Sequence, residues 1–401
     1  MSLIIVNHTF SIRDGQGQVN RRLVEAMARH GHRVKVVTGD ADDRFGEPSV
    51  EVRVAKVPSR LPTPLAHQWF AWRVGRTLRA WREPGDRVVL NGSMAYRRCD
   101  LNLCHFVHAA WLRSAGHDWA KDRSPKSAYQ WLFTRGNAAW ERLAYRQARR
   151  VIAVSERVKQ DLMDHVGVPA AKIDVVPNGL DLGRFTAGED AVDTDTDASW
   201  RASLKLDGSM FVVGFCGDLK TRRKNLDVLL RAVATLPERV HVVAAGAFEG
   251  GPYPALVETL GLSNRVHLLG RVHDMPNFFR GCDAFVGLSH YEPWGLMLAE
   301  AMASGRAVVA ADSVGAAGLI REGENGLRLR DPDDARGLAA RLSRLVDDPD
   351  LRGRLGRAAR ETAEGLDWPV IGRRYHQLIT ALAAPAETNP HTRPTPAGEF
   401  A

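Results

Sequence analysis

The stretch of sequence that decides the fold is FVGLSHYEPWGLMLAEAMASGRAVVAA, residues 285–311. Apolar runs at both ends, a turn-rich loop and a segment of helix-forming composition predict a strand, a loop, a helix and a second strand. Glu292 lies in the loop before the predicted helix, and Glu300 lies about one turn inside it. The unpaired N–H groups of a helix start favour an anion. An anionic ligand on this helix end would therefore have a carboxylate on either side.

The rest of the chain repeats the alternation of strand and helix, which is typical of α/β domains with parallel sheets. A chain of 401 residues is too long for one average domain and suits two. The net charge of +8 fits an anionic substrate, an anionic membrane surface or a nucleic acid. Because the basic residues are spread along the chain and no recognition motif occurs, we expect no nucleic-acid partner.

The four cysteines have no metal or redox spacing, and three lie in or beside apolar runs. Reduced and mostly buried thiols are typical of intracellular proteins. No apolar run approaches the length of a membrane span, and the N-terminus lacks the basic segment of a signal peptide. We therefore expect a cytoplasmic protein that does not cross a bilayer.

A glycine-bearing loop follows the first predicted strand. Residues 3–6 are apolar, residues 14–18 read DGQGQ, and residues 19–29 carry a helical stripe. Gly15 and Gly17 would let a ligand approach the backbone at the carboxyl end of the strand. Neither the dinucleotide fingerprint nor a P-loop is present. A plain turn between strand and helix is the alternative interpretation.

A loop rich in cations follows the strand predicted over residues 210–216. This loop, residues 217–225, reads GDLKTRRKN and precedes a predicted helix. Ligands of open α/β sheets bind at the carboxyl ends of strands, and a helix start is a second reason to expect a phosphate. A merely solvated loop is the alternative. The cations are Lys220, Arg222, Arg223 and Lys224.

Glu292 and Glu300, with Pro293, Trp294 and Gly295 between them, resemble the E-x7-E motif of family 4 of the retaining nucleotide-sugar glycosyltransferases. The exit of the predicted helix, Ala-Met-Ala-Ser-Gly, is similar as well. The glycine loop, the cation loop and the stretch over residues 151–185 resemble the same family.

The resemblance implies the GT-B fold, an α/β architecture of two Rossmann-like domains whose parallel sheets face each other across a cleft. It places an acceptor domain at residues 1–180 and a nucleotide-sugar domain at residues 181–365. Residues 366–383 would form a helix that crosses back to the first domain. Residues 384–401, rich in Pro, Thr and Ala, are predicted to be a disordered tail.

The resemblance also implies a role for each side chain of the site. Glu300 would accept hydrogen bonds from the two ribose hydroxyls of the donor, and Glu292 would hold hydroxyls of the sugar. Lys224 and a neighbouring arginine, Arg223 or Arg222, would neutralise the diphosphate. Further substrate-binding positions would be Gly15, Gly17, Asn178, Arg184, Gly217, Pro293, Trp294, Gly295, Leu296 and Met297.

His105 and His108 lie three positions apart near the end of an apolar run. They could be a metal pair, but no third ligand is suggested nearby. In the family, a histidine after a late strand of the N-terminal domain lines the donor-sugar pocket. By position His108 is the better match and His105 the second, and a histidine satisfied within the core is the alternative. The Asp-x-Asp of residues 190–199 lies in a polar linker, so we interpret it as a solvated loop.

Residues 65–83, LAHQWFAWRVGRTLRAWRE, predict a basic helix rich in tryptophan. Such a helix could lie on an anionic lipid surface. The interpretation we favour is that its tryptophan face packs on a sheet while its arginines stay in water.

Together these features predict a metal-independent, retaining glycosyltransferase that uses a nucleoside-diphosphate sugar and a hydroxyl acceptor. No carboxylate pair is placed as nucleophile and acid, so the glycosidase scheme does not apply. The expected acceptor is a carbohydrate or lipid-linked sugar of cell-envelope polysaccharide or lipopolysaccharide assembly, and a small natural product is the alternative. We expect no cofactor, and peripheral contact with the inner membrane face is compatible with the sequence. The alternative functional classes are an epimerase or phosphorylase and a non-catalytic nucleotide-sugar binding protein.

Overall fold

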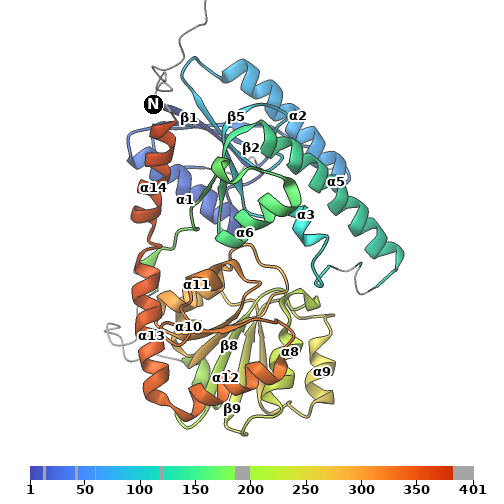
Figure 1. The fold of residues 1–401 in the computed structure, drawn as a ribbon, viewed down its shortest axis with the longest axis vertical. Helices are drawn as coiled ribbons and strands as arrows, with labels where there is room; N and C mark the ends of the chain where they lie inside the picture. Colours follow the sequence, from blue (N-terminus) through green and yellow to red (C-terminus); the bar gives the residue numbers. More distant parts are fainter. Residues whose placement is uncertain are drawn as a thin grey trace, which may run out of the picture.

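The computed structural model describes residues 1–11, 15–40, 44–58, 60–117, 119, 122–185 and 199–382. Asp14 of the glycine loop, almost all of the acidic stretch 190–199 and the tail 384–401 lie outside these residues. The strands of the described part form two parallel sheets, one in each half of the chain (Figure 1). The predicted α/β class with two parallel sheets is therefore confirmed.

The first sheet has seven strands in the order β3-β2-β1-β4-β5-β6-β7. Most of them are the buried apolar runs that the sequence predicts, but β3 was not predicted. In β3, Glu51 and Arg53 alternate with valines, and the strand pairs only with β2 at the edge of the sheet, so it lacks the apolar run of a central strand. The strands are β1 (Ser2–Val6), β2 (Arg33–Thr38), β3 (Val50–Val54), β4 (Arg87–Asn91), β5 (Cys99–Cys104), β6 (Ala148–Ala153) and β7 (Ile173–Val175).

The helix that follows β1 begins earlier than the sequence predicts. Gly15 and Gly17 were expected in a loop, but they form the first turn of α1. A Cβ on Gly15 would lie 2.9 Å from Leu296 Cδ1, so the start of α1 closely approaches the second domain at this glycine. The helices of this half are α1 (Gly15–Arg29), α2 (Thr63–Trp81), α3 (His108–Trp111), α5 (Pro125–Gln147) and α6 (Glu156–Asp161).

The prediction that the tryptophan face of α2 packs on the sheet is wrong for Trp69 and Trp72, although Trp81 at the end of the helix is buried in the core. Phe70, Val74 and Leu78, spaced four residues apart, are the buried stripe of this helix. Trp69 is 40% exposed and Trp72 is 46% exposed. Trp72 lies two residues from Phe70, hence about 200° around the helix, so the two rings cannot face the same sheet.

The second sheet has six strands in the order β10-β9-β8-β11-β12-β13. The strand, helix and strand predicted over residues 285–311 are β11, α11 and β12, and β11 pairs in parallel with both β12 and β8. The strands are β8 (Phe211–Cys216), β9 (Val240–Ala245), β10 (Val266–Gly270), β11 (Ala284–Gly287), β12 (Ala307–Ala311) and β13 (Leu327–Leu329). The helices are α7 (Ser199–Ser203), α8 (Leu226–Val233), α9 (Tyr253–Thr259), α10 (Met275–Arg280), α11 (Leu296–Ala303), α12 (Ala335–Asp347) and α13 (Pro349–Glu364).

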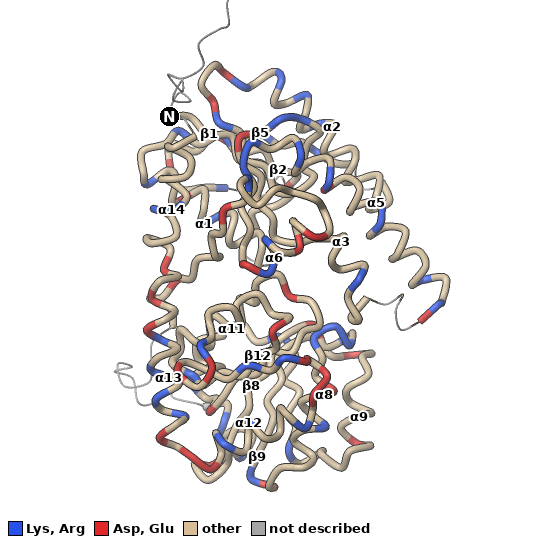
Figure 2. Tube along the Cα trace, viewed as in Figure 1, with Lys and Arg blue, Asp and Glu red and all other residues tan. Residues whose placement is uncertain are grey.

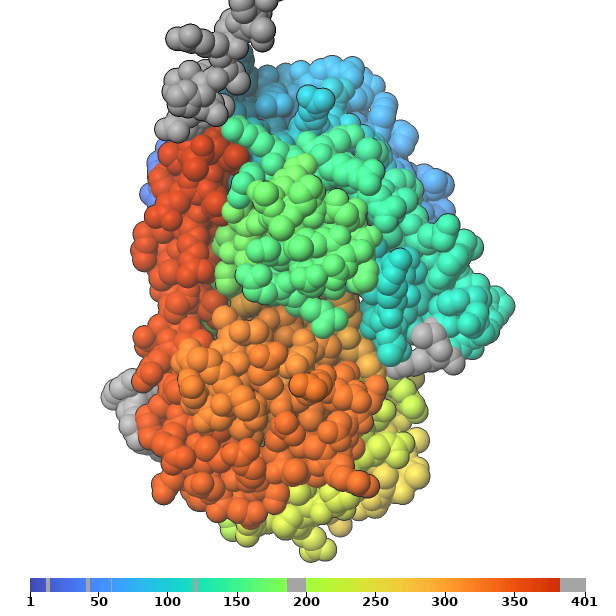
Figure 3. Space-filling model, viewed as in Figure 1, coloured from blue at the N-terminus to red at the C-terminus, as the bar shows by residue number. Residues whose placement is uncertain are grey.

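The chain passes between the two halves twice, and the two passages are hydrogen-bonded to each other. The Leu180 N–H donates to Leu366 O at 2.8 Å, and the Trp368 N–H donates to Leu180 O at 3.0 Å. The last helix, α14 (Trp368–Ala381), then lies along the first half beside α1, as predicted (Figures 1 and 3). Its buried Ile371, Tyr375 and Ile379 join the core beneath β1 and β2. No helix in the described part of the chain is both long and apolar enough to span a membrane.

Candidate active site

Two loops meet where the strand order of the second sheet reverses. The chain builds outward from β8 to β10 on one side and from β11 to β13 on the other, so the crevice of the sheet opens between β8 and β11. Arg223 and Lys224 follow β8, and Glu292 follows β11. A cavity of about 300 Å³ is lined by both loops. The topology therefore brings the predicted cations and the predicted carboxylate to one place.

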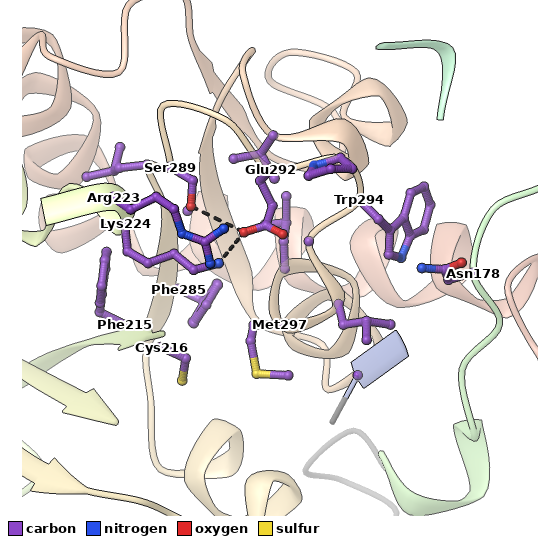
Figure 4. A pocket seen from close by; sticks show the side chains of 18 of the residues that line it. Asn178, Phe215, Cys216, Arg223, Lys224, Phe285, Ser289, Glu292, Trp294 and Met297 are labelled. Atoms are coloured by element: carbon purple, nitrogen blue, oxygen red, sulfur yellow. Dashed lines mark hydrogen bonds and ion pairs between the residues drawn. The ribbon is translucent and has the colours of Figure 1, made fainter. Parts of the chain in front are cut away.

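Lys224 and Glu292 form an ion pair in this cavity. Lys224 Nζ donates a hydrogen bond to Glu292 Oε2, and Ser289 Oγ lies 3.5 Å from the same oxygen (Figure 4). Burial alone would raise the pKa of Glu292, but the charge and hydrogen bond of Lys224, with the charge of Arg223, hold that pKa below its usual value. Glu292 is therefore an ionised carboxylate that holds Lys224 at the cavity.

The loop after β11 leads directly into α11 at the wall of the cavity. Gly295 has a φ of 99°, and a Cβ on it would lie 2.7 Å from Val314 Cγ1, so only glycine fits before this helix. No side chain caps the N-terminus of α11. Its first N–H groups thus remain available to an anion. The neighbouring residues that line the cavity are Pro293, Trp294, Leu296 and Met297.

The first domain holds the Glu292 loop from the opposite side. Ser155 Oγ, which caps α6, donates to Pro293 O at 2.7 Å. The Val107 N–H donates to Tyr291 Oη at 3.2 Å. These contacts connect the end of the first sheet to the motif loop, so the site lies between the two domains.

Glu300 lies in a second cavity of about 1000 Å³, which shares Gly15, Leu296 and Met297 with the first. Arg184 lines the same cavity. Burial raises the pKa of Glu300 to about 8, against the opposing charge of Arg184. Its Oε2 has no hydrogen-bond partner among the described residues. A buried oxygen of this kind is ready to accept a hydrogen bond from a ligand.

The structure separates the two candidate histidines. His105 lines the cavity that holds Lys224 and Glu292, and its buried Nε2 has no partner in the described part of the chain. His108, favoured by position in the sequence, lines a neighbouring cavity of the first domain. Its Nδ1 lies 2.5 Å from Glu141 Oε1. His105, which directly follows β5, lines both cavities, whereas His108, at the start of α3, does not line the one that holds Lys224 and Glu292.

The remaining predicted positions are distributed over the three cavities. Asn178 and Gly15 line the first cavity, and Gly217 lines the second. Gly17 lines the neighbouring cavity of the first domain. Of the two candidate arginines, Arg223 lines the first cavity, whereas Arg222 is exposed outside its lining.

Sequence reasoning missed several residues of the first cavity. Phe215 and Cys216 line it, and Ser289 approaches Glu292 from the motif loop. Their position at the carboxyl ends of β8 and β11 was the available signal, because open α/β sheets bind ligands there. In the described residues, no group of three or more His, Cys, Asp or Glu side chains could hold a metal ion.

Two family profiles match the chain. The profile described as Glycosyltransferase Family 4 matches residues 13–184, and the profile described as Glycosyl transferases group 1 matches residues 196–362. The D-inositol 3-phosphate glycosyltransferase of Corynebacterium jeikeium is 33% identical over 245 residues. That match covers 58% of this chain and 57% of the relative, little more than half of its length.

Two solved structures are similar over almost the whole chain. Sucrose-phosphate synthase from Thermosynechococcus elongatus has a TM-score of 0.77 at 21% identity, covering 95% of this chain and 99% of that one. Anabaena Alr3699/HepE in complex with UDP-glucose has a TM-score of 0.72 at 22% identity, covering 95% of this chain and 100% of that one. At such identities the likeness establishes the fold alone. With one profile on each domain, the chain belongs to family 4 of the glycosyltransferases and has the GT-B fold.

Proposed function

We propose that this chain is a retaining glycosyltransferase that moves a sugar from a nucleoside-diphosphate sugar to a hydroxyl acceptor. The observation that carries the proposal is the convergence of Lys224, Arg223 and the uncapped start of α11 on the cavity that contains Glu292. Fixed positive charge and helix N–H groups at one place stabilise a diphosphate as it leaves, and such preorganised electrostatics often contribute more to catalysis than any other effect.

In the proposed step, the bond between the anomeric carbon and the diphosphate oxygen breaks, and its electron pair stays with the phosphate. The acceptor hydroxyl attacks the anomeric carbon from the same face, and its proton passes to the departing phosphate oxygen. Lys224 and Arg223 stabilise the charge that develops on this oxygen. Glu292 holds sugar hydroxyls and His105 approaches the sugar from the first domain. Glu300, in the adjoining cavity, accepts the ribose hydroxyls.

The step is proposed to need no metal ion and no cofactor, because the cations and the helix start supply the charge that a divalent ion would provide. The purified enzyme should keep its transfer rate in excess EDTA. Strong inhibition that added Mg²⁺ reverses would contradict metal independence while leaving the transferase activity in place.

A donor screen tests the proposed activity directly. HepE was solved with UDP-glucose, so UDP-glucose belongs in the panel beside UDP-N-acetylglucosamine and GDP-mannose. A nucleotide sugar that binds only the folded chain raises its melting temperature. The stabilising donor is then supplied with a radiolabelled sugar. Hydrolysis or transfer supports the enzyme, whereas binding without turnover supports a non-catalytic nucleotide-sugar binding protein.

We propose that the protein acts in the cytoplasm at the inner membrane face, on a lipid-linked or polysaccharide acceptor of the cell envelope. Trp69 and Trp72 of α2 are exposed, and so are Tyr129 and Leu132 of α5. Basic residues occur along both helices (Figure 2). Apolar rings among arginines suit an anionic lipid surface. Flotation should recover the protein with phosphatidylglycerol vesicles and not with phosphatidylcholine vesicles. Recovery with neither would contradict membrane contact, and equal recovery with both would contradict the preference for an anionic surface.

A further inference from the structure

We propose that the acceptor binds in the third cavity, at the carboxyl ends of β1, β4 and β5, and that this cavity selects an uncharged sugar or polyol over its phosphate ester. The proposal rests on the glycosyltransferase function proposed above and concerns the class of its acceptor.

The third cavity is continuous with the donor site. It has a volume of about 310 Å³, near the lower end of the range for small-ligand pockets. It shares Gln16, His105 and Phe106 with the cavity that holds Lys224 and Glu292. The first sheet reverses its strand order between β1 and β4, so this cavity lies at the place where an open α/β sheet binds ligands.

The lining of this cavity offers no fixed positive charge. Among the described residues that line it there is no lysine and no arginine. Burial lowers the pKa of His105 to about 4, and burial with the neighbouring His67 lowers that of His8 to about 4. Burial, followed by the charge of His108, lowers the pKa of His67 as well. These three histidines are therefore uncharged at neutral pH.

The one carboxylate among the described residues of the lining is already engaged. Glu141 is 3% exposed and accepts hydrogen bonds from both the His108 N–H, at 2.9 Å, and His108 Nδ1, at 2.5 Å. Nδ1 is thus the protonated nitrogen facing Glu141. A phosphate dianion placed in this cavity would lie near the buried Glu141 and would find no lysine or arginine among the described lining residues, which makes its burial costly.

Hydroxyl groups, in contrast, find partners here. Asn91 Oδ1 and His105 Nε2 are buried and have no hydrogen-bond partner in the described part of the chain. Both residues line the cavity. A hydroxyl can donate to either atom, and unmade hydrogen bonds of buried groups are costly, so a polyol stabilises the site where an apolar ligand would not. Besides the histidines, the other neutral polar residues of the described lining are Asn7, Thr9, Gln16, Ser93, Asn137 and Tyr145.

The relative from Corynebacterium jeikeium is named for a phosphorylated acceptor, D-inositol 3-phosphate. The third cavity of this chain favours an uncharged acceptor instead. The two proteins would share the donor chemistry of the family and differ in the charge that their acceptor sites tolerate.

The test compares matched pairs of ligands by calorimetry on the full chain saturated with UDP. The pairs are myo-inositol with D-inositol 3-phosphate, and glucose with glucose 6-phosphate. At least one uncharged member should bind roughly tenfold or more tightly than its phosphate ester, because the described lining has no lysine or arginine to pair with the buried phosphate. Tighter binding of either ester than of its parent would overturn the proposal. Failure of both uncharged members to bind would overturn it as well.

A gain-of-charge variant makes the test specific to this cavity. Ser93→Arg adds a cation to the lining, and it should shift the preference toward the phosphate ester by roughly tenfold, the weight of a charge-assisted contact. Ser209→Arg adds the same charge at an exposed position of the second domain and should leave the preference unchanged. An equal shift in both variants would show that net charge, and not this cavity, sets the preference.

Hydrolysis of the nucleotide sugar in the absence of acceptor separates the two proposals. If the donor is hydrolysed while the phosphate esters bind better, the acceptor inference fails and the glycosyltransferase function stands. If no donor is turned over under any condition, the function itself fails.

Discussion

At the scale of single residues, the site depends on cations that the protein places before any ligand arrives. Lys224 is held by Glu292, whose pKa stays low despite its burial. Such preorganisation matters because charge that is already in place need not reorient during the reaction. Arg223 lines the same cavity, whereas Lys220 of the same loop is exposed. The loop therefore contains basic side chains that line the site and others, such as Lys220, that face solvent.

Replacing Lys224 with methionine should lower kcat by about two to three orders of magnitude, the usual effect of removing one group that stabilises transition-state charge. Lys220→Met removes an exposed lysine from the same loop and should leave kcat unchanged. Steady-state rates with the stabilising donor measure both variants, and circular dichroism checks their folds. Near-normal transfer by Lys224→Met would show that the diphosphate is stabilised by other groups.

The raised pKa of Glu300 predicts a pH-dependent affinity for nucleotide. The carboxyl is protonated below about pH 8, and ribose hydroxyls donate more strongly to the ionised form. Only the ionised fraction binds fully, so the affinity for UDP should rise about tenfold between pH 7 and pH 9. Calorimetry across this range measures the effect, with a proton released on binding at pH 7. Glu300→Gln should flatten the profile; a profile unchanged by that substitution would mean that another group titrates.

At the scale of elements, the start of α11 is set by backbone geometry. Gly295 has a φ of 99° and packs against Val314. On the other side of the loop, a Cβ on Gly315 would overlap Pro293 O, so a side chain there would collide with the loop. The motif loop can then turn sharply enough to place Glu292 before the helix and Glu300 within it. The spacing of Glu292 and Glu300 in the sequence therefore brings both carboxylates to the site only because the loop turns here.

Gly295→Ala should therefore reduce both stability and nucleotide binding. The added methyl meets Val314 and the positive φ disfavours any side chain, so a loss of about 1–3 kcal/mol of unfolding free energy is expected. Gly318→Ala is the matched control, since its Cβ would meet open space. Urea midpoints and UDP affinities of both variants are the measurement. Comparable behaviour of the two would show that α11 does not need the glycine.

At the scale of the whole molecule, the halves are held together by two hydrogen-bonded passages and by α14. Trp368 packs so closely on Gly179 that a Cβ there would lie 2.6 Å from the ring. The packing also buries titratable groups in both halves. The histidines whose pKa is lowered by burial are His8, His32, His67, His105, His241 and His267.

These histidines predict a loss of stability in mild acid. Their pKa values are lower in the folded chain than the usual 6.5, so below pH 6.5 the unfolded chain binds more protons and stability falls. A histidine whose pKa drops to about 4 costs about 2 kcal/mol at pH 5. Urea midpoints at pH 7.5 and pH 5 measure the loss. His8→Gln should reduce it, whereas replacing the exposed His273 should not; an equal stability at both pH values would contradict the prediction.

The sequence by itself determined the alternation of strands and helices, the two parallel sheets and the family. These features follow from local periodicity and from a motif whose residues lie within one loop and one helix. It also placed Lys224 and Glu292 at strand ends, which parallel topology brings to a common edge.

Only the tertiary structure decided which neighbour in each ambiguous pair faces the site. Arg223 lines the cavity and Arg222 does not, and His105 enters the crevice while His108 turns to Glu141. Likewise α2 buries Phe70 and exposes Trp72. Periodicity reports that a segment has an apolar side, but the rotation of that side toward a particular sheet depends on residues far away in the chain. The charge of the third cavity is decided in the same way, because its lining comes from the ends of several strands and from helices α1, α2, α3 and α5.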